Sequence, residues 1–317
     1  MRCILTSLIL ASISISSSAL WRNDGQEKEC THSPQPVEIT NSCDSLLRKF
    51  VHSQPDSIIR HHQLTTVFDT LVHSDRPLRV LHIGDSHVAG KSLPMAVKQY
   101  LGNAFGLAEN DSVNSGISFS FIAKNGATAL NFLTPERKES IRGKNADLVI
   151  MSFGTNECHG MGYREEEHLA SLTAAVDTVR SLCPEATILL TTPPGDYLSH
   201  RTRYYIKGRD GKRYRRYRYN RKPNPMTTRC AALICRYAEE QDMPVWDLNT
   251  IVGGEMSVRN WQKQNMMRKD MIHFYPEGYA FQGRMFGEAL VKAYNRYLVE
   301  RTFIDESITI INKYVEY

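Results

Sequence analysis

Short apolar segments alternate along this chain with longer segments in which apolar residues recur at helical spacing. A strand that is apolar throughout, rather than at every second residue, is typical of a parallel sheet with helices on both faces. The alternation therefore predicts one three-layer α/β domain around a parallel five-stranded sheet. The expected strands are 79–84, 117–123, 147–154, 187–192 and 244–248, and the expected helices are 57–72, 88–101, 164–182, 227–241 and 279–299.

The beginning of the chain has the features of an export signal. Arg2 precedes an apolar run from Cys3 to Ile15, and small residues follow up to Ala19. We therefore expect residues 1–19 to be a signal peptide that is cleaved, which predicts a secreted or periplasmic protein. A transmembrane anchor is the alternative, but the run is too short and too rich in serine to span about 30 Å of hydrocarbon. No membrane-spanning segment is expected after cleavage.

Residues 20–56 are polar and lack a sustained period, which predicts an irregular segment before the α/β domain at 57–317. Loss of the signal leaves six cysteines, and in an exported protein these can form disulfides. Six cysteines allow fifteen pairings, of which Cys30–Cys43 is the favoured one because both lie in the polar segment. Cys230 and Cys235 are expected on different faces of one helix. No cysteine has the spacing of a metal site.

The first expected strand ends in Gly84-Asp85-Ser86-His87. A serine on a tight turn between a strand and a helix exposes its hydroxyl, and its backbone N–H lies at the helix start, where it can stabilise an oxyanion. A serine hydroxyl is a weak nucleophile until a base within hydrogen-bond distance removes its proton. We therefore consider Ser86 a candidate nucleophile that needs a histidine partner.

The histidine best suited to that role is His273, one of eleven in the chain. Asp270 precedes it by three residues, in an expected loop before the last helix. An aspartate there can accept the proton of one ring nitrogen, so that the other nitrogen faces the serine. The spacing thus predicts His273 as the base and Asp270 as the acid that orients it.

Two further strand ends carry groups that can bind an oxyanion. Asn156 follows the third expected strand, and its amide can donate to a developing negative charge. Gly126 follows the second expected strand, where the missing side chain lets a backbone N–H approach the same oxygen. Ligands bind beyond the carboxyl ends of the strands in such sheets. The predicted oxyanion donors are therefore Ser86, Gly126 and Asn156.

Taken in chain order, these pieces resemble the four sequence blocks of the SGNH/GDSL hydrolase superfamily. The similar segments are Gly84-Asp85-Ser86-His87 for the nucleophile block, Gly126 for the glycine block, Gly154-Thr155-Asn156 for the asparagine block and Asp270 to His273 for the acid–base block. The resemblance covers residues 78–299. It implies a flavodoxin-like sheet and a Ser-His-Asp acyl hydrolase that uses neither a metal nor a cofactor.

Within that superfamily, the blocks are most similar to those of bacterial carbohydrate O-acetyl esterases of the peptidoglycan type. This resemblance implies the removal of acyl groups, with acetyl expected, from an acylated carbohydrate or cell-envelope polysaccharide. Two positions depart from the family pattern: His87 replaces the leucine of GDSL enzymes, and Lys124 replaces a small or apolar residue. The second departure leaves Gly116 as an alternative to Gly126 as the glycine donor.

A strongly basic segment follows the fourth expected strand. Between Arg201 and Lys222 the sequence has eleven Lys and Arg and one acid, whereas the whole chain has a net charge of +5. Asp210-Gly211 between two tyrosine-rich arms predicts a β-hairpin at 200–222, on the active-site side of the sheet. Its tyrosines and arginines can bind a sugar or a polyanion. A hairpin made basic for solubility is the alternative, and nucleic acid is not expected as a partner of an exported protein.

The candidate substrate-binding residues are His87, Glu157, Tyr214, Arg215, Arg216 and Tyr217. Two other functions stay open on the same scaffold. One is an O-acyltransferase, in which a sugar hydroxyl takes the place of water, and the other is a non-catalytic carbohydrate-binding protein. A lipase is disfavoured because the sequence has no long apolar lid segment. The sequence does not predict the oligomeric state.

Overall fold

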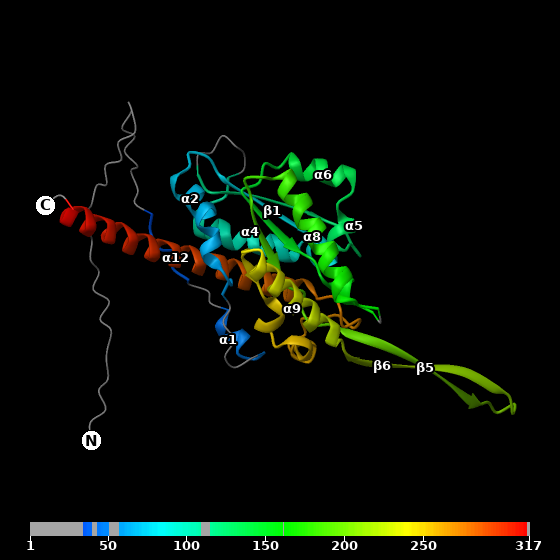
Figure 1. Ribbon diagram of the computed structural model, residues 1–317. Coiled ribbons are helices and arrows are strands. Elements are labelled where there is room, and N and C mark those ends of the chain that lie inside the picture. Colours follow the sequence, from blue (N-terminus) through cyan, green and yellow to red (C-terminus); the bar gives the residue numbers. More distant parts are fainter. Residues whose placement is uncertain (1–33, 40–42, 51–56, 109–114, 161, 316–317) are drawn as a thin grey trace, which may run out of the picture. The chain divides into compact units, whose positions relative to one another are not determined.

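Five parallel strands form the central sheet, in the order β2-β1-β3-β4-β7. The computed structural model describes residues 34–39, 43–50, 57–108, 115–160 and 162–315 (Figure 1). Each expected strand is present, and the predicted α/β fold with a parallel five-stranded sheet is confirmed. The strands are β1 Leu78–Gly84, β2 Ile117–Ala123, β3 Leu148–Ser152, β4 Thr187–Thr191 and β7 Val245–Trp246.

Helices of different lengths follow or connect these strands. The long ones agree with the helical periods of the sequence, and several short ones occupy segments whose length is too small for a period to be recognised. The elements are α1 Asp44–Leu47, η1 His61–Leu64, α2 Thr65–His73, α3 Ser86–Ala89, α4 Ser92–Phe105, α5 Ala129–Phe132, α6 Pro135–Arg142, α7 Thr155–Cys158, α8 Glu165–Leu182, α9 Pro225–Glu240, α10 Leu248–Ile251, η2 Gly254–Met256, α11 Ser257–Lys263 and α12 Pro276–Val315.

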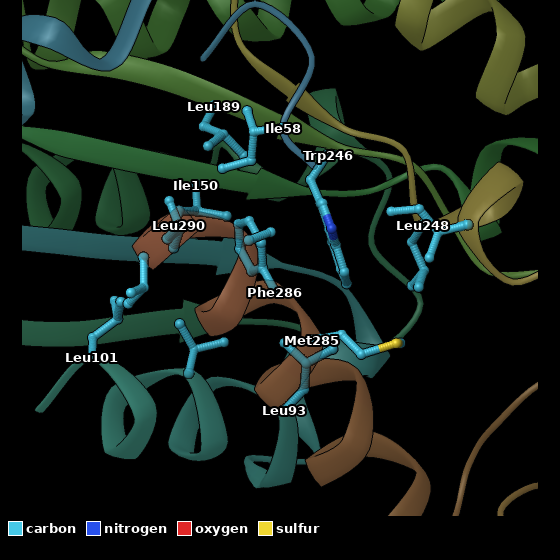
Figure 2. Packing of buried hydrophobic residues seen from close by; sticks show 14 of the residues in the cluster. Ile58, Leu93, Leu101, Ile150, Leu189, Trp246, Leu248, Met285, Phe286 and Leu290 are labelled. Carbon is cyan, nitrogen blue, oxygen red and sulfur yellow. The ribbon is translucent and has the colours of Figure 1, made fainter. Parts of the chain in front are cut away.

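The inner strands β3 and β4 are buried on both faces, which explains why they are apolar, whereas the edge strand β2 is mostly half-buried and contains serines. In β3, Leu148 and Ile150 belong to the core that α4 and α12 share, whereas Val149 and Met151 belong to the core that α5, α8 and α9 share. Figure 2 shows the first core, in which side chains of the sheet face those of α12. Burial of one such aliphatic side chain contributes about 1.5–3 kcal/mol. The two cores therefore hold the carboxyl ends of the strands on a rigid frame.

Two helices differ from their expected bounds for local backbone reasons. The helix expected from residue 57 begins only with η1, because Ile59 exchanges backbone hydrogen bonds of 2.9 and 3.2 Å with Val245. The helix expected at 88–101 is two helices, α3 and α4. They are separated at Gly90 and Lys91, and Lys91 has a φ of 65° that a continuous helix cannot contain.

The N-terminal part requires a correction. The expected signal peptide and Cys30 lie outside the described residues. The prediction of an irregular segment over 20–56 is wrong for 43–50, where α1 forms and where Leu47 and Phe50 join the core. The ring of Phe50 lies 4.4 Å from that of Trp261. A single helical turn has no period, so the polar composition around it concealed a segment that packs on the domain.

The described cysteines all carry free thiols. Cys43 is among them, and the expected partner Cys30 lies outside the described residues. Cys230 and Cys235 lie on α9 as expected, and Cys230 is fully buried whereas Cys235 is half-buried. Across the part of the chain that the structure describes, no helix combines the length and the apolar character needed to cross a membrane.

The basic segment forms an antiparallel hairpin, as predicted, from β5 Tyr197–Lys207 and β6 Arg213–Pro223. Its turn includes Gly211, whose φ of 76° lies in the left-handed region that favours glycine. All residues from Ser199 to Lys207 and from Arg213 to Lys222 are exposed. The two strands thus form a ribbon with water on both faces, and this ribbon leaves the α/β body (Figure 1).

Candidate active site

Ser86 lies directly beyond the carboxyl end of β1, at the first position of α3. Asp85 precedes that helix, and its Oδ1 accepts the backbone N–H of His87 at 2.9 Å. Gly84 makes the sharp turn possible, because a Cβ there would lie 2.8 Å from the carbonyl oxygen of Ser152 on the neighbouring strand β3. The turn therefore places the half-buried Ser86 at the carboxyl end of β1, next to β3, and open α/β sheets bind ligands beyond the carboxyl ends of their strands.

His273 joins Ser86 to Asp270 through its two ring nitrogens. Its Nε2 lies 3.1 Å from the Oγ of Ser86, and its Nδ1 lies 3.0 Å from Oδ2 of Asp270. The tautomer that fits places the proton on Nδ1, so that Nε2 can accept the serine proton. The three side chains that the sequence singled out thus form one hydrogen-bonded chain.

The loop that carries Asp270 is shaped to present it to the histidine. The other carboxylate oxygen, Oδ1, accepts the backbone N–H groups of Ile272 and His273, each at 3.0 Å. Met271 between them has a φ of 61°, in the left-handed region. Partial burial raises the pKa of Asp270, but these backbone donors and the His273 ring outweigh it and hold the pKa below its ordinary value. Asp270 is therefore an anion at neutral pH.

Asn156 and Gly126 flank the same edge of the sheet. The Asn156 Nδ2 donates to the carbonyl oxygen of Ala127 at 2.9 Å and makes a longer contact of 3.3 Å with Oδ2 of Asp85. Gly126 is exposed, with a φ of 70° and open space where a Cβ would be. Gly154, before Asn156, has a φ of 128°, and a Cβ on it would lie 2.8 Å from Pro193. A glycine is thus required at position 154 to place Asn156 beside the nucleophile turn.

A family model supplies the observation that identifies the chain. Residues 82–281 match the model of the GDSL-like lipase/acylhydrolase family, which is more than half of the chain. The chain belongs to this family. It is accordingly a carboxylic ester hydrolase that removes acyl groups, with the SGNH/GDSL fold that the sequence predicts. Every block on which the resemblance rests lies inside the matched segment.

A comparison with solved structures also finds similar chains, of which the first named here has the same fold. A structure described as "Peptidoglycan O-acetylesterase in action, 5 min" matches with a TM-score of 0.58 and 18% identity, over 75% of this chain and 96% of that one. A putative GDSL-like lipase from Parabacteroides merdae matches with a TM-score of 0.47 and 16% identity, over 69% and 97%. The periplasmic domain of a lipopolysaccharide acetyltransferase from Salmonella ser. Paratyphi A matches with a TM-score of 0.44 and 12% identity, over 80% and 98%. The comparison with curated proteins finds no match.

His87 is a buried residue of this GDSL-family site. Its Nε2 lies 3.1 Å from the Thr155 hydroxyl and its Nδ1 lies 3.2 Å from the Tyr279 hydroxyl. Burial lowers the pKa of His87 to about 3, so the ring is neutral. The side chain that replaces the family's leucine therefore connects the nucleophile turn to α7 and α12. The expected substrate contact gains no support from this geometry, because both ring nitrogens already face protein groups.

Glu157 also holds the framework of the site. Its carboxylate accepts the backbone N–H of Ala129 at 2.8 Å and that of Gly154 at 2.9 Å. Burial raises its pKa, and these two donors act in the opposite direction. The side chain thus ties the start of α5 to the loop before Asn156, and both oxygens are engaged. Its expected contact with substrate gains no support from this geometry.

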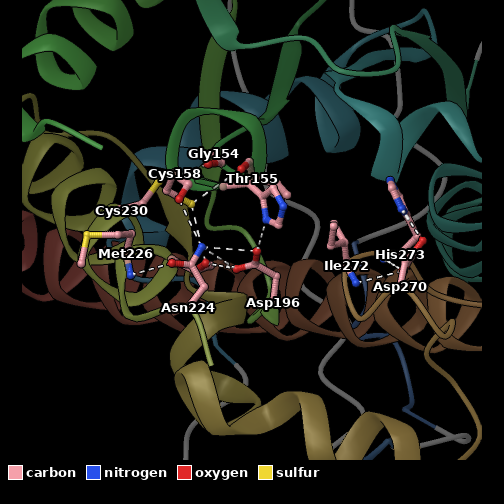
Figure 3. A network of polar contacts seen from close by, with 12 residues as sticks. Gly154, Thr155, Cys158, Asp196, Asn224, Met226, Cys230, Asp270, Ile272 and His273 are labelled. Atoms are coloured by element: carbon pink, nitrogen blue, oxygen red, sulfur yellow. Dashed lines mark hydrogen bonds and ion pairs between the residues drawn. The ribbon is translucent and has the colours of Figure 1, made fainter. Parts of the chain in front are cut away.

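A second histidine–aspartate pair lies near the catalytic one and was not expected from the sequence. The Nδ1 of His159 lies 2.5 Å from Oδ2 of buried Asp196, and Thr227 also donates to that carboxylate. Asn224 donates to it as well, as Figure 3 shows. The hydrogen bond to Asp196 raises the pKa of His159, and the negative charges of Asp196 and Asp270 raise it further. Burial acts in the opposite direction.

No motif marks this pair, because 37 residues separate its members. The available signal was that Asp196 closely follows a strand, at the edge where the site lies.

Within the described residues, no group of three or more His, Cys, Asp or Glu side chains is arranged to hold a metal ion.

The hairpin is attached to the loop that carries Asp270. The backbone N–H of Tyr197, the first residue of β5, donates to the carbonyl oxygen of Met271 at 3.0 Å. The guanidinium of Arg221, near the end of β6, donates to the carbonyl oxygen of Lys269. Both strands therefore contact an immediate neighbour of Asp270. The predicted contacts Tyr214, Arg215, Arg216 and Tyr217 lie in the outer half of the ribbon, paired with residues 203–206.

Proposed function

We propose that the protein is an exported serine esterase that removes acyl groups, acetyl above all, from a carbohydrate through an acyl-enzyme on Ser86. The observation that carries this proposal is the chain from Ser86 through His273 to Asp270, with distances of 3.1 and 3.0 Å. A base within hydrogen-bond distance of a serine, itself oriented by a carboxylate, is the arrangement that activates a hydroxyl for attack.

The reaction has two steps on the same residues. The Oγ of Ser86 forms a bond with the ester carbonyl carbon while its proton passes to Nε2 of His273. The sugar oxygen then leaves with that proton, and the acyl group stays on Ser86. Water attacks the acyl carbon while His273 removes a proton from it. The bond between that carbon and Oγ of Ser86 then breaks, Oγ takes the proton back from His273, and the carboxylic acid is released. Throughout, Asp270 stabilises the imidazolium without taking its proton.

The oxyanion of each tetrahedral intermediate needs donors that are already in place. The N–H groups of Ser86 and Gly126 and the amide of Asn156 fill this role in our proposal. One amide hydrogen of Asn156 is engaged by the Ala127 carbonyl, and the other has only the long contact of 3.3 Å with Asp85. That second hydrogen is weakly engaged, and in our proposal it is the one that donates to the oxyanion.

Two observations support the substrate class and the location. The structure with a TM-score of 0.58 is described as a peptidoglycan O-acetylesterase, which supports an acetylated glycan as substrate. The apolar run that ends before Ala19 supports export.

Acyl transfer to a sugar hydroxyl uses the same acyl-enzyme intermediate. Measuring the release of acetate in water against transfer of acetate to an added oligosaccharide separates a hydrolase from a transferase.

The experiment that tests the proposal measures turnover of p-nitrophenyl acetate and acetate release from acetylated glycans. Ser86→Ala should lower kcat by about 10⁴-fold or more, because the nucleophile is lost while the fold stays. Ser140→Ala is the matched control, since Ser140 is an exposed serine on α6. Turnover by Ser86→Ala within a few-fold of the unmodified protein would disprove the proposed mechanism.

A further inference from the structure

The two faces of the hairpin differ in chemistry. Because β5 and β6 pair with Lys207 opposite Arg213, odd-numbered residues share one face and even-numbered residues share the other. We call the odd-numbered residues of 201–207 and 213–221 the odd face, and the even-numbered residues of 198–206 and 214–222 the even face. The odd face has six Lys and Arg, whereas the even face has three. The one acid of the hairpin, Asp210, accepts a hydrogen bond from Tyr214 of the even face.

Arginine and tyrosine side chains of the odd face are stacked on one another. The guanidinium carbons of Arg201 and Arg215 lie 4.7 and 5.6 Å from the ring centre of Tyr217. Those of Arg203 and Arg213 lie 5.9 and 5.1 Å from that of Tyr205. Every cation–π contact of the hairpin is thus on this face. A guanidinium over a ring loses rotational freedom while its N–H edge stays open, which prepares it to bind carboxylate or phosphate.

The charges of the odd face lower the stability of the hairpin by itself. An isolated two-stranded hairpin is marginally stable in water, and like charges directly opposite each other destabilise it. Lys207 and Arg213 are such a pair. A ribbon needed only for solubility would gain nothing by gathering six cations on one face, whereas bound anions would remove their repulsion. The tyrosine rings, 38% to 62% exposed, add flat surfaces suited to sugar rings.

The odd face leads to the active site but is too long for a small substrate. Arg221 is a member of this face and also contacts the loop of Asp270. Tyr217 pairs with Arg203, and Arg203 lies six residues beyond Tyr197, the first residue of β5. Six residues correspond to about 20 Å of strand. A ligand that touches both the stacked arginines and Ser86 must therefore be a polymer.

We propose that the odd face binds a polyanionic glycan, a polysaccharide with carboxylate or phosphate groups along its chain, and so selects the polymer whose acyl groups reach Ser86. This inference rests on the proposed esterase function and names its substrate class. Charge complementarity favours the polyanion, and the tyrosine rings favour a glycan over other polyanions. Small esters, which cannot reach the stacked arginines, are hydrolysed without help from this face.

Two triple variants with the same change of charge test the proposal. The odd-face variant is Arg203→Gln with Arg213→Gln and Arg215→Gln. The control is Lys212→Gln with Arg218→Gln and Lys222→Gln, three exposed cations that lie outside the odd face. Acetate release is measured on O-acetylated polygalacturonate, on neutral O-acetylated xylan and on p-nitrophenyl acetate. We expect the odd-face variant to raise KM for the polygalacturonate by about tenfold or more and the control by less than about threefold. Both should hydrolyse the two neutral substrates as the unmodified protein does.

Binding is measured separately, so that failure of the esterase proposal can be recognised. Ser86→Ala protein, alone or with each triple change, is run in native gels that contain de-esterified polygalacturonate, DNA of equal charge density or no polymer. Retardation by polygalacturonate that only the odd-face change removes supports the proposal, even if the unmodified protein proves inactive on every ester. Equal losses from both triple changes, no retardation, or stronger retardation by DNA would overturn it.

Discussion

The Oγ of Ser86 lies 3.1 Å from Nε2 of His273, although 187 residues separate the two positions in the chain. The parallel sheet makes this contact possible, since Ser86 follows β1 and His273 lies in the loop before α12. That helix packs beside β1 and β3 in one core. The contact therefore depends on the whole α/β framework, and the residues that orient it can be tested singly.

Asp270→Asn should lower kcat by about 10³–10⁴-fold on p-nitrophenyl acetate. Asn has an NH2 group in place of one carboxylate oxygen, and this group donates to Nδ1 of His273. The ring then carries its proton on Nε2, so Nε2 cannot take the serine proton. The Oδ1 contacts with Ile272 and His273 can persist, and the thermal stability should change little. A loss of less than tenfold in kcat, with the protein folded, would contradict the role of Asp270.

His87→Leu restores the leucine that the family pattern has at this position, and it should destabilise the protein. The change leaves the Thr155 and Tyr279 hydroxyls without their imidazole partner in a buried place, at a cost of about 1–3 kcal/mol for each group. Urea unfolding measures this loss. The KM for a small ester should stay within a few-fold of its normal value. A raised KM with unchanged stability would instead support the sequence-based expectation that His87 contacts substrate.

Asp85 should make stability fall as pH rises. Burial raises the pKa of Asp85 to about 8, so the folded protein keeps a proton there that the unfolded chain loses near pH 4. Because the folded state binds more protons over this interval, its stability decreases towards pH 8 and levels off above it. Asp85→Asn removes this dependence of stability on pH. The difference in Tm between Asp85→Asn and the unmodified protein should therefore become more positive between pH 5 and pH 9.

A difference that does not change over that interval would show that Asp85 is ionised throughout. The proton also matters for the proposed chemistry, because a neutral Asp85 beside Asn156 places no negative charge next to the oxyanion. We accordingly expect kcat to decline above about pH 8 in the unmodified protein.

His159 should keep its proton to a higher pH than an isolated histidine, because Asp196 raises its pKa. The pair contributes stability that is fully present below the pKa of the unfolded chain and is lost as pH rises through the higher folded pKa. NMR titration of the His159 ring in the unmodified protein and in Asp196→Asn measures this directly. The pKa should drop in the variant, and the stability difference between the two proteins should be largest near pH 5. An identical titration curve in both would refute the coupling.

The sequence predicted the sheet well, because a buried strand such as β3 or β4 is a short apolar run that has no helical period. The triad residues were also accessible, since each lies at a strand end or beside its partner in sequence. The burial of individual side chains could not be predicted from the sequence. His87 has the same polar appearance whether it faces substrate or connects Thr155 to Tyr279. The pairing of His159 with Asp196, and the division of the hairpin into two faces, depend on distances and register that only the folded chain supplies.

The most direct test of the account is covalent labelling of the nucleophile. The protein is treated with a fluorophosphonate, which phosphonylates an activated serine, and the adduct is located by peptide mass spectrometry. We predict a single adduct on Ser86, complete loss of esterase activity in proportion to labelling, and no adduct in His273→Ala, in which the serine lacks its base. Activity that survives full labelling, or an adduct on a serine other than Ser86, would contradict the assignment of Ser86 as the nucleophile.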